Sequence, residues 1–387
     1  MTQRTIYLDN AATTGVHPDV LEAMLPYLQG EYGNPSSTHT LRRAARQAVE
    51  SARERVAAVL GCSPDEVVFT GGGTESINLA IKGLVHAAGE GGHIVTTAIE
   101  HHAVLHTVEQ LEREGYETTV LPVSPEGVLD PDEVRRALRP DTRLVSVMLA
   151  NNEIGTIQPV AEVARICREA GVLVHSDCVQ AAGALNLDVD ALGVDSLALS
   201  GHKFQAPKGV GVMYLRRGSH IEPQSVGGGQ ESGRRAGTEN VAYIVGIAAA
   251  LERAARRREE YTAHCTALRD SLFERILAET PDARVNGDRT RRLPNNVHVS
   301  FRGIEAQGLL MGLDMKGVCA SSGSACVSAS LSPSHVLEAI GVPSEYIYGS
   351  LRLTVGAATT AEDVDEAMAH LPGLVRRLQA LSPLAVG

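Results

Sequence analysis

Short apolar runs alternate with amphipathic stretches between residues 67 and 215. The apolar runs predict strands at EVVFT, HIVTT, ETTVLPV, RLVSVML, GVLVHS, SLALS and VGVMYL. Stretches with helical periodicity lie between several of them, such as AVLHTVEQLEREG and PVAEVARICREAG, the latter ended by Gly171. This alternation predicts an α/β fold with a mostly parallel sheet and helices on both faces. No helix separates the last two runs, so we expect these two strands to be antiparallel.

The pattern changes after Gly237. The segment TENVAYIVGIAAALERAARRREEYTAHCTALRDSLFERILAE predicts one long helix or two abutting helices. Short strands (NNVHVSF, LRLTV) and helices (EAQGLLMGL, AEDVDEAMAHLPGLVRRLQAL) follow, as in a smaller α+β domain. Because 387 residues exceed one ordinary core, we expect a large domain over residues 15–259. We expect a small domain over 1–14 and 260–387.

Composition indicates a soluble globular protein and narrows its partners. Hydrophobic residues make up 43% of the chain, and the net charge of −11 argues against binding to nucleic acid or an anionic membrane surface. Residues 1–14 lack a signal-peptide pattern, and no apolar run could span a bilayer. The six cysteines form no C-x-x-C pair and have no histidine at zinc-finger spacing, so we expect reduced thiols, no metal and a cytoplasmic location.

Polar side chains follow several of the predicted strands at the point where each strand ends. In an open α/β sheet, ligands bind beyond the carboxyl ends of the strands. These groups therefore predict one site, and its candidate residues are Gly73 and Thr74 in GGGTES, His101 in AIEHHA, Asn152 in ANNEIG, Asp177 and Gln180 in DCVQ, and Ser200, His202 and Lys203 in SGHK.

Lys203 decides which ligand suits this site. Taken alone, the lysine is more typical of a solvated turn, and GGGTES of an ordinary glycine turn. Together, one lysine, one strand-end carboxylate, one imidazole and one anion cradle match pyridoxal 5′-phosphate, because lysine supplies the Schiff base and a carboxylate keeps the pyridine nitrogen protonated. A nucleotide is the competing ligand, but GGGTES lacks both the Rossmann spacing and the Walker lysine.

The segments HSDCVQAAG and SLALSGHKFQAPKGVG resemble the fold-type I pyridoxal-phosphate enzymes, and more narrowly the cysteine desulfurases of the NifS/IscS type. The resemblance covers nearly the whole chain and includes IYLDNAATT, YGNPSSTH, IEHHAVL, ANNEIGTIQPV, GGGQESGRRAGTENV, SSGSACVSASLSPSHVL and LRLTVG. The cysteine-bearing segment is the most specific of these, because fold-type I aminotransferases have no such loop.

The resemblance implies a role for each candidate residue. Lys203 would form the Schiff base, Asp177 would pair with the pyridine nitrogen, and His101 would stack on the ring and move protons. The remaining cofactor contacts would come from Gly73, Thr74, Ser200 and His202 at the phosphate, and from Asn152 and Gln180 near the substrate and the ring oxygen. Thr238 would reach the phosphate of a neighbouring subunit, which implies a homodimer.

The substrate contacts and the sulfur carrier also follow from the resemblance. Asn34, Asn152 and Arg352 would hold the substrate, the first and last at its carboxylate. Cys326 would attack the substrate sulfur and carry a persulfide. We expect its loop, residues 318–334, to be mobile, because SSGSACVSAS has no large apolar residue except Val327.

The implied activity is conversion of L-cysteine to L-alanine, with the sulfur passed from an enzyme persulfide to an acceptor protein for iron–sulfur cluster or other sulfur-compound biosynthesis. Two alternatives are a selenocysteine lyase and another fold-type I aminotransferase or lyase in which Cys326 is incidental. A non-catalytic interaction protein on this fold is a third, which the presence of both Lys203 and Asp177 disfavours. Departures from the family are small: Ser232 follows Gln230 and Glu231 where members often have arginine.

Overall fold

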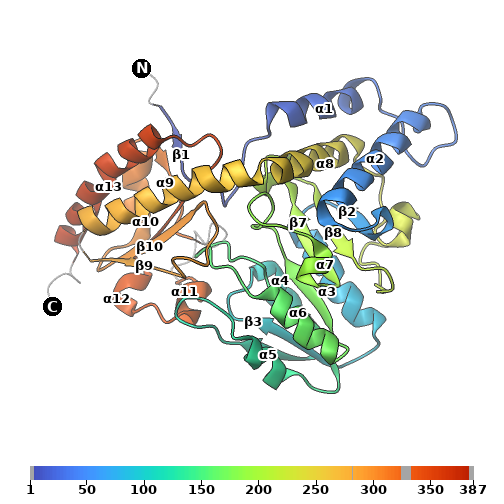
Figure 1. Ribbon diagram of the computed structural model, residues 1–387, viewed down its shortest axis with the longest axis horizontal. Helices are drawn as coiled ribbons and strands as arrows, with labels where there is room; N and C mark the ends of the chain where they lie inside the picture. Colours follow the sequence, from blue (N-terminus) through green and yellow to red (C-terminus); the bar gives the residue numbers. More distant parts are fainter. Residues whose placement is uncertain (1–3, 281, 324–332, 383–387) are drawn as a thin grey trace.

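The structure is a computed structural model that describes residues 4–280, 282–323 and 333–382. A seven-stranded sheet lies at the centre of the larger part of the chain (Figure 1). Its strand order is β2-β8-β7-β6-β5-β3-β4. The strands are β2 (Val67–Thr70), β3 (His93–Thr97), β4 (Glu117–Leu121), β5 (Thr142–Ser146), β6 (Leu173–Asp177), β7 (Ser196–Ser200) and β8 (Gly211–Leu215). Each coincides with one of the predicted apolar runs, so this expectation is confirmed.

Strand direction decides which ends of this sheet meet. β3 pairs in parallel with β4 and β5, β5 with β6, and β6 with β7. β8 is antiparallel to both of its neighbours, β7 and β2, which confirms the expected antiparallel pair. Since β2 and β7 both oppose β8, they run in the same direction, and the carboxyl ends of β2, β3, β5, β6 and β7 share one edge.

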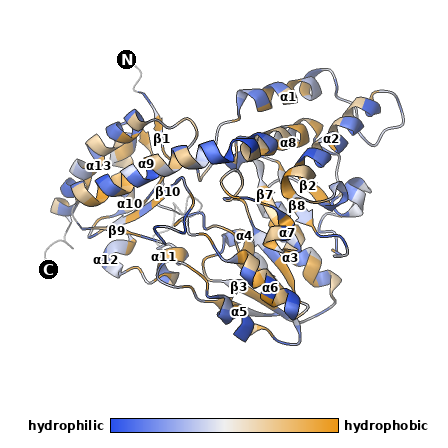
Figure 2. Ribbon diagram, viewed as in Figure 1, coloured by the Kyte–Doolittle hydropathy of each residue, from blue (hydrophilic) through white to orange (hydrophobic). Residues whose placement is uncertain are grey.

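Helices pack around this sheet. Those before β8 are α1 (Pro18–Gln29), α2 (Arg42–Leu60), α3 (Gly73–Ala87), α4 (His102–Arg113), α5 (Pro131–Ala137), α6 (Val160–Glu169) and α7 (Val189–Leu192), with single 3₁₀ turns at η1 (Pro64–Glu66) and η2 (Gly201–Lys203). Amphipathic helices such as α6 place apolar residues against the sheet and polar ones toward solvent (Figure 2). Burial of each large apolar side chain contributes about 1.5–3 kcal/mol, which holds the helices on the sheet.

Two abutting helices follow the large sheet, one of the two forms expected from the sequence. α8 (Val241–Arg256) and α9 (Arg258–Glu279) are separated by Arg257 alone, and α9 continues toward the second part of the chain (Figure 1). There, β12 (Ser350–Thr354), β10 (Asn296–Phe301) and β9 (Ala283–Val285) form an antiparallel sheet, and β1 (Ile6–Tyr7) pairs in parallel with β11 (Val318–Cys319). The other elements are η3 (Gln230–Gly233), α10 (Ala306–Asp314), α11 (His335–Ala339), α12 (Ser344–Ile347) and α13 (Ala361–Leu381).

Separate hydrophobic cores accompany the two sheets. The cores around the large sheet draw on residues between Val20 and Leu251, whereas the core of the small sheet combines Ile6 and Leu8 with residues from Cys265 to Val375. A further cluster packs residues of α11 and α12 against Ile99 and Met148 of the large part. The domain boundaries at residues 14/15 and 259/260 stay a prediction. None of the described helices has the length and apolar character needed to cross a membrane.

Candidate active site

A cavity of about 290 Å³ opens at the edge where the parallel strands end. Its volume is close to the lower limit of small-molecule sites, which is about 300 Å³. The strand-end groups and one arginine from the small sheet line it, namely Gly73, Thr74, His101, Asn152, Asp177, Gln180, Ser200, His202, Lys203 and Arg352. These residues come from distant parts of the sequence. They meet in one pocket because most of them follow strands that run in the same direction.

Asp177 ends β6 and is only 5% exposed. Its Oδ1 accepts a hydrogen bond of 2.9 Å from the backbone N–H of Val179. Burial raises the pKa of the Asp177 carboxyl to about 6, while this hydrogen bond and the charge of Lys203 act in the opposite direction. A buried carboxylate of this kind favours a positively charged partner in the pocket.

Lys203 lies in η2, directly after β7, and is half-buried. Its Nζ donates to the backbone carbonyl oxygens of Ala11 (2.6 Å) and Ala12 (3.0 Å). Gln180 also donates to the carbonyl of Ala11, at 2.9 Å. The lysine is therefore held inside the pocket by the N-terminal segment and is not on a solvated turn.

His101 is the N-cap residue of α4. Its Nδ1 accepts a hydrogen bond of 3.0 Å from the backbone N–H of Ala103, which fixes the ring. Burial lowers the pKa of His101 to about 4, and the charge of Lys203 adds to this effect. At neutral pH the imidazole is uncharged, and because Nδ1 accepts, its single proton is on Nε2.

The N-terminus of α3, with Gly73 and Thr74, borders one side of the pocket. A Cβ atom at Gly73 would lie 2.9 Å from Cγ2 of Val179 and 3.2 Å from Cβ of Ser200, so glycine allows this close approach. His202 stands nearby with its Nδ1 3.1 Å from Oγ1 of Thr13. Burial, then Lys203 and Lys208, lower the pKa of His202 to about 4. A phosphate binds well to the backbone N–H groups at the first turn of a helix, and nearby hydroxyl and imidazole groups add further contacts.

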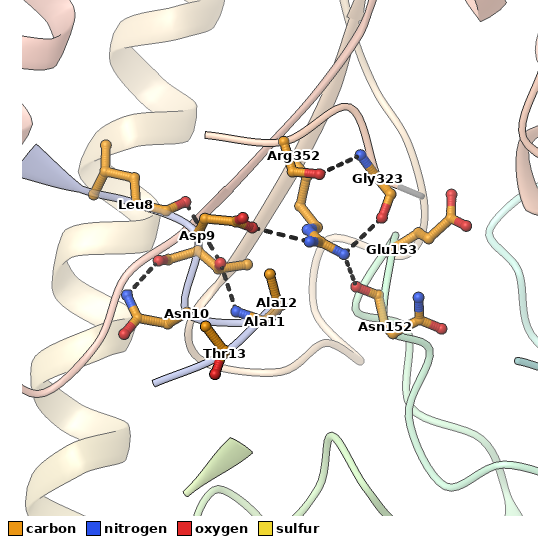
Figure 3. Close-up of polar contacts among 12 residues, drawn as sticks. Leu8, Asp9, Asn10, Ala11, Ala12, Thr13, Asn152, Glu153, Gly323 and Arg352 are labelled. Carbon is orange, nitrogen blue, oxygen red and sulfur yellow. Dashed lines mark hydrogen bonds and ion pairs between the residues drawn. The ribbon is translucent and has the colours of Figure 1, made fainter. Parts of the chain in front are cut away.

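Arg352, on β12, approaches the pocket from the small sheet and is 2% exposed. Figure 3 shows its guanidinium between three acceptors. Nη1 donates to the carbonyl oxygens of Asn152 (2.8 Å) and Gly323 (2.7 Å), and Nη2 pairs with Oδ1 of Asp9 at 3.0 Å. Its buried Nε has no hydrogen-bond partner among the described residues. An unsatisfied buried donor on a guanidinium suits a bound carboxylate.

Two of the other predicted site residues, Asn34 and Thr238, are not among the described residues that line this pocket. Asn34 is exposed, and its Oδ1 accepts a hydrogen bond of 2.8 Å from the N–H of Ser36. Thr238 is also exposed and is not part of the lining of the pocket within one chain. Cys326 lies outside the described residues.

Sequence reasoning missed some groups of the site. Asp9 binds Arg352, and Glu153 and His335 line the pocket. Asp9 directly follows a short apolar run in IYLDNAATT, so its position at the end of this run could have been noticed. That run does not predict a contact with an arginine 343 residues later.

A second cavity, of about 490 Å³, also borders Lys203. Its wall includes Arg253, Arg257 and His264, and Lys203 is the only strand-end candidate that it shares with the first pocket, as far as the described residues show. The smaller pocket is therefore the candidate active site.

Comparisons with known proteins identify the family of this chain. The family model described as aminotransferase class-V matches residues 6–367. The cysteine desulfurase IscS of Methanosarcina thermophila is 50% identical over 98% of this chain and 94% of its own length, and that of Dictyoglomus turgidum is 48% identical over 98% and 97%. Among solved structures, a NifS-like protein superposes with a TM-score of 0.91 at 39% identity, covering 97% of this chain and all of that one.

The regions matched by the family model and by the relatives include both sheets and the segments that build the pocket. The fold, the strand-end lysine and the relatives lead to the same assignment. The chain belongs to the aminotransferase class-V family, among the cysteine desulfurases of the IscS and NifS type.

Proposed function

We propose that this protein is a pyridoxal-phosphate-dependent cysteine desulfurase that converts L-cysteine to L-alanine and transfers the sulfur to Cys326. The observation that carries the proposal is that Lys203, Asp177 and the anion cradle at Gly73 line the same pocket. A lysine for covalent attachment, a carboxylate for the pyridine nitrogen and a cradle for the phosphate are what this cofactor requires.

The pocket residues fit the cofactor in three ways. Asp177 has a raised pKa because it is buried, and a protonated pyridine nitrogen would stabilise its charge. The N-terminus of α3, with Thr74, Ser200 and His202, would hold the phosphate, and the uncharged His101 would lie on the ring. When bound, pyridoxal phosphate supplies an electron sink that weakens the bonds at the α- and β-carbons of the amino acid.

Lys203 is the residue that we assign to proton transfer at the α-carbon of cysteine. Its Nζ is directed into the site by the carbonyl oxygens of Ala11 and Ala12, so a free amine here would keep one orientation. Proton transfer by a positioned group contributes about 10²–10⁴-fold to rate. His101, neutral and with its proton on Nε2, would donate a hydrogen bond from Nε2 toward the substrate, because Nδ1 already accepts from the N–H of Ala103.

Arg352 is the residue that we assign to the substrate carboxylate. Nε is a donor without a partner among the described residues, and Nε and Nη2 together form the edge to which a carboxylate binds with two hydrogen bonds. Asn152 lies beside it, since the carbonyl oxygen of Asn152 already accepts from Nη1. Asn34 stays a prediction for this carboxylate, because it is exposed and not among the residues lining the pocket of one chain.

Cys326 is assigned as the sulfur acceptor from the family resemblance and from the state of the other thiols. Burial raises the pKa of Cys62, Cys167, Cys178 and Cys265 to about 12, and it also raises the pKa of Cys319. These five thiols are thus poor nucleophiles at neutral pH. In the transfer, the Cys326 thiolate bonds to the substrate sulfur as the carbon–sulfur bond breaks. The electron pair of that bond stays on the β-carbon, which takes a proton to become the methyl group of alanine.

We also propose a homodimer, with Thr238 of each subunit reaching the phosphate of the other. Thr238 is exposed in the single chain, and Val226, which precedes it in the same connection, is 94% exposed. Leu21, Leu25 and Leu28 expose an apolar stripe on α1 that a second subunit could cover. A cytoplasmic location and a sulfur-acceptor protein in iron–sulfur or other sulfur-compound biosynthesis stay predictions.

The test is the reaction itself. Purified protein loaded with pyridoxal phosphate is given L-cysteine and a thiol reductant, and alanine and sulfide are measured together. Equal amounts of both products support the desulfurase. An aminotransferase would form an oxo acid without sulfide, and a selenocysteine lyase would prefer selenocysteine in direct competition.

A further inference from the structure

We propose that Asp9 is a positioning and selectivity residue for the substrate carboxylate: it fixes the guanidinium of Arg352 and weakens carboxylate binding there through its own negative charge. This inference rests on the assignment of Arg352 to the substrate carboxylate. It adds a residue to which sequence reasoning gave no role.

The guanidinium of Arg352 is held on two sides. Nη1 donates to the carbonyl oxygens of Asn152 and Gly323, and Nη2 donates to Oδ1 of Asp9 (Figure 3). The side chain of Arg352 is 2% exposed and that of Asp9 is 18% exposed. A charge pair so far removed from water has a stronger mutual effect than a surface pair, so Asp9 sets both the orientation and the net charge of the site.

The Nε–H of Arg352 lies next to this pair. Nε–H is buried without a partner among the described residues, and it points to the same side of the guanidinium as one hydrogen of Nη2. A substrate carboxylate that takes these two donors would share Nη2 with Asp9. Two carboxylates on one guanidinium repel each other, so a bound carboxylate gains less than it would from an unpaired arginine.

The backbone on both sides of Asp9 is anchored, which keeps the side chain of Asp9 within reach of Arg352. The N–H of Thr354 donates to the carbonyl of Leu8 at 2.7 Å, and Nδ2 of Asn10 donates to the carbonyl of Thr354 at 2.8 Å. The N–H of Ala11 donates to Oγ1 of Thr354 at 2.9 Å. The segment is thus attached to β12, the strand that carries Arg352.

Glu153 is a second acid close to Arg352, but it acts differently. Its Oε2 accepts a hydrogen bond of 2.6 Å from the hydroxyl of Ser334, and burial raises the pKa of Glu153. Asp9, by contrast, contacts the guanidinium directly. The charge that a substrate carboxylate meets on this arginine is therefore chiefly that of Asp9.

The test removes the charge and keeps the hydrogen-bond acceptor. In Asp9→Asn, the amide oxygen can still accept from Nη2, so Arg352 stays in place with an uncompensated charge. Binding to the cofactor-loaded enzyme is measured by calorimetry with propionate, which has only the carboxylate, with ethylamine, which has only the amine, and with L-alanine. We expect propionate and L-alanine to bind about tenfold more tightly to the variant, and ethylamine to bind equally to both proteins.

Steady-state kinetics give a second readout. The KM for L-cysteine should fall about tenfold in Asp9→Asn while kcat does not rise, because the change acts on carboxylate binding and not on the bond-breaking steps. A residue that only supports the fold would not produce this combination. Asp365→Asn is the matched control: Asp365 is 72% exposed and pairs with Arg275 at 2.7 Å, so its neutralisation alters net charge equally and should leave all three ligands unaffected.

Two further variants distinguish a wrong proposal for Asp9 from a wrong assignment of Arg352. Asp9→Ser also removes the charge and retains a hydroxyl acceptor, so it serves if Asp9→Asn does not fold. Unchanged or weaker propionate binding in a folded, charge-neutral variant overturns the proposal for Asp9. If Arg352→Gln binds propionate as well as the parent does, the assignment of Arg352 itself is wrong, and the failure lies in the proposed function.

Discussion

The Nζ of Lys203 donates a hydrogen bond of 2.6 Å to the backbone carbonyl oxygen of Ala11, a residue 192 positions earlier in the chain. Two residues before Ala11, the side chain of Asp9 binds the guanidinium of Arg352. One short segment therefore contacts both the lysine of the large sheet and the arginine of the small sheet. The groups proposed to act at the α-carbon and at the carboxylate of one substrate molecule are positioned relative to each other by this segment.

Replacement of Lys203 by alanine should abolish turnover and leave the protein folded. Loss of proton transfer alone lowers the rate by about 10²–10⁴-fold, and covalent attachment of the cofactor is lost as well. Sulfide release and the visible absorption of the cofactor measure the two effects, and circular dichroism measures the fold. Lys208→Ala is the control, because Lys208 is exposed in the same turn. A Lys203→Ala enzyme with parental activity would refute the assignment of this residue.

The buried carboxyl of Glu100 should make stability fall as the pH rises. Burial raises the pKa of Glu100 from 4.5 to about 8 in the folded protein, although Thr97 and the N–H of Met148 donate to Oε1. Between these two pH values the unfolded chain loses this proton while the folded protein retains it. The contribution of Glu100 to the free energy of unfolding is therefore complete below pH 4.5 and lost as the pH rises through 8. The loss is on the order of 3–5 kcal/mol.

Glu100→Gln isolates this effect, because the amide cannot ionise. We expect the free energy of unfolding of the variant, relative to that of the parent, to increase as the pH rises from 5 to 9. Urea denaturation of the cofactor-free proteins at both pH values measures this difference. Glu126→Gln, at an exposed position, should show no such gain. If the stability difference between Glu100→Gln and the parent is equal at both pH values, Glu100 does not retain its proton as described.

Replacement of Cys326 by serine should separate substrate binding from sulfur transfer. Lys203, Asp177 and Arg352 are intact in this variant, so L-cysteine should still change the spectrum of the bound cofactor. Alanine should not accumulate, because a serine hydroxyl is a far weaker nucleophile toward sulfur than a thiolate. In the parent, mass spectrometry before reduction should find one extra sulfur on the peptide that contains Cys326.

Cys319→Ser is the matched control for this experiment. Burial raises the pKa of Cys319, and the residue pairs in β11 with Tyr7 of β1, so its loss should leave sulfur transfer intact. An extra sulfur found on Cys319, together with full activity of Cys326→Ser, would show that the nucleophile is misassigned.

A charge on the apolar stripe of α1 should dissociate the proposed dimer. Leu25 is 39% exposed between Leu21 and Leu28, and a glutamate there would have to be desolvated in an interface. Sedimentation velocity of Leu25→Glu should show a monomer, and activity should fall with dissociation because Thr238 no longer reaches a neighbouring site. Leu381→Glu, at another exposed leucine, should remain dimeric. A parent protein that is active as a monomer would exclude the dimer.

The sequence by itself determined the large sheet and most of the cofactor side of the pocket. Apolar runs of strand length separated by helical periods specify strands that run in parallel, and parallel strands place their carboxyl ends at one edge. Lys203, Asp177 and His101 each follow such a run, so local pattern alone predicts that they meet.

The resemblance implied Arg352 for the substrate, but only the tertiary structure decided which groups hold it at the pocket. Arg352 is buried on β12, and its pairing with Asp9 joins residues 343 positions apart. No local periodicity encodes such a contact, because it depends on how the N-terminal segment packs on the small sheet and how that sheet meets the large one. Local periodicity likewise does not predict that Asn34 is exposed, or which carbonyl oxygens accept hydrogen bonds from Lys203. Every residue has the same backbone carbonyl group, so three-dimensional packing, and not residue type, selects the carbonyls that reach the site.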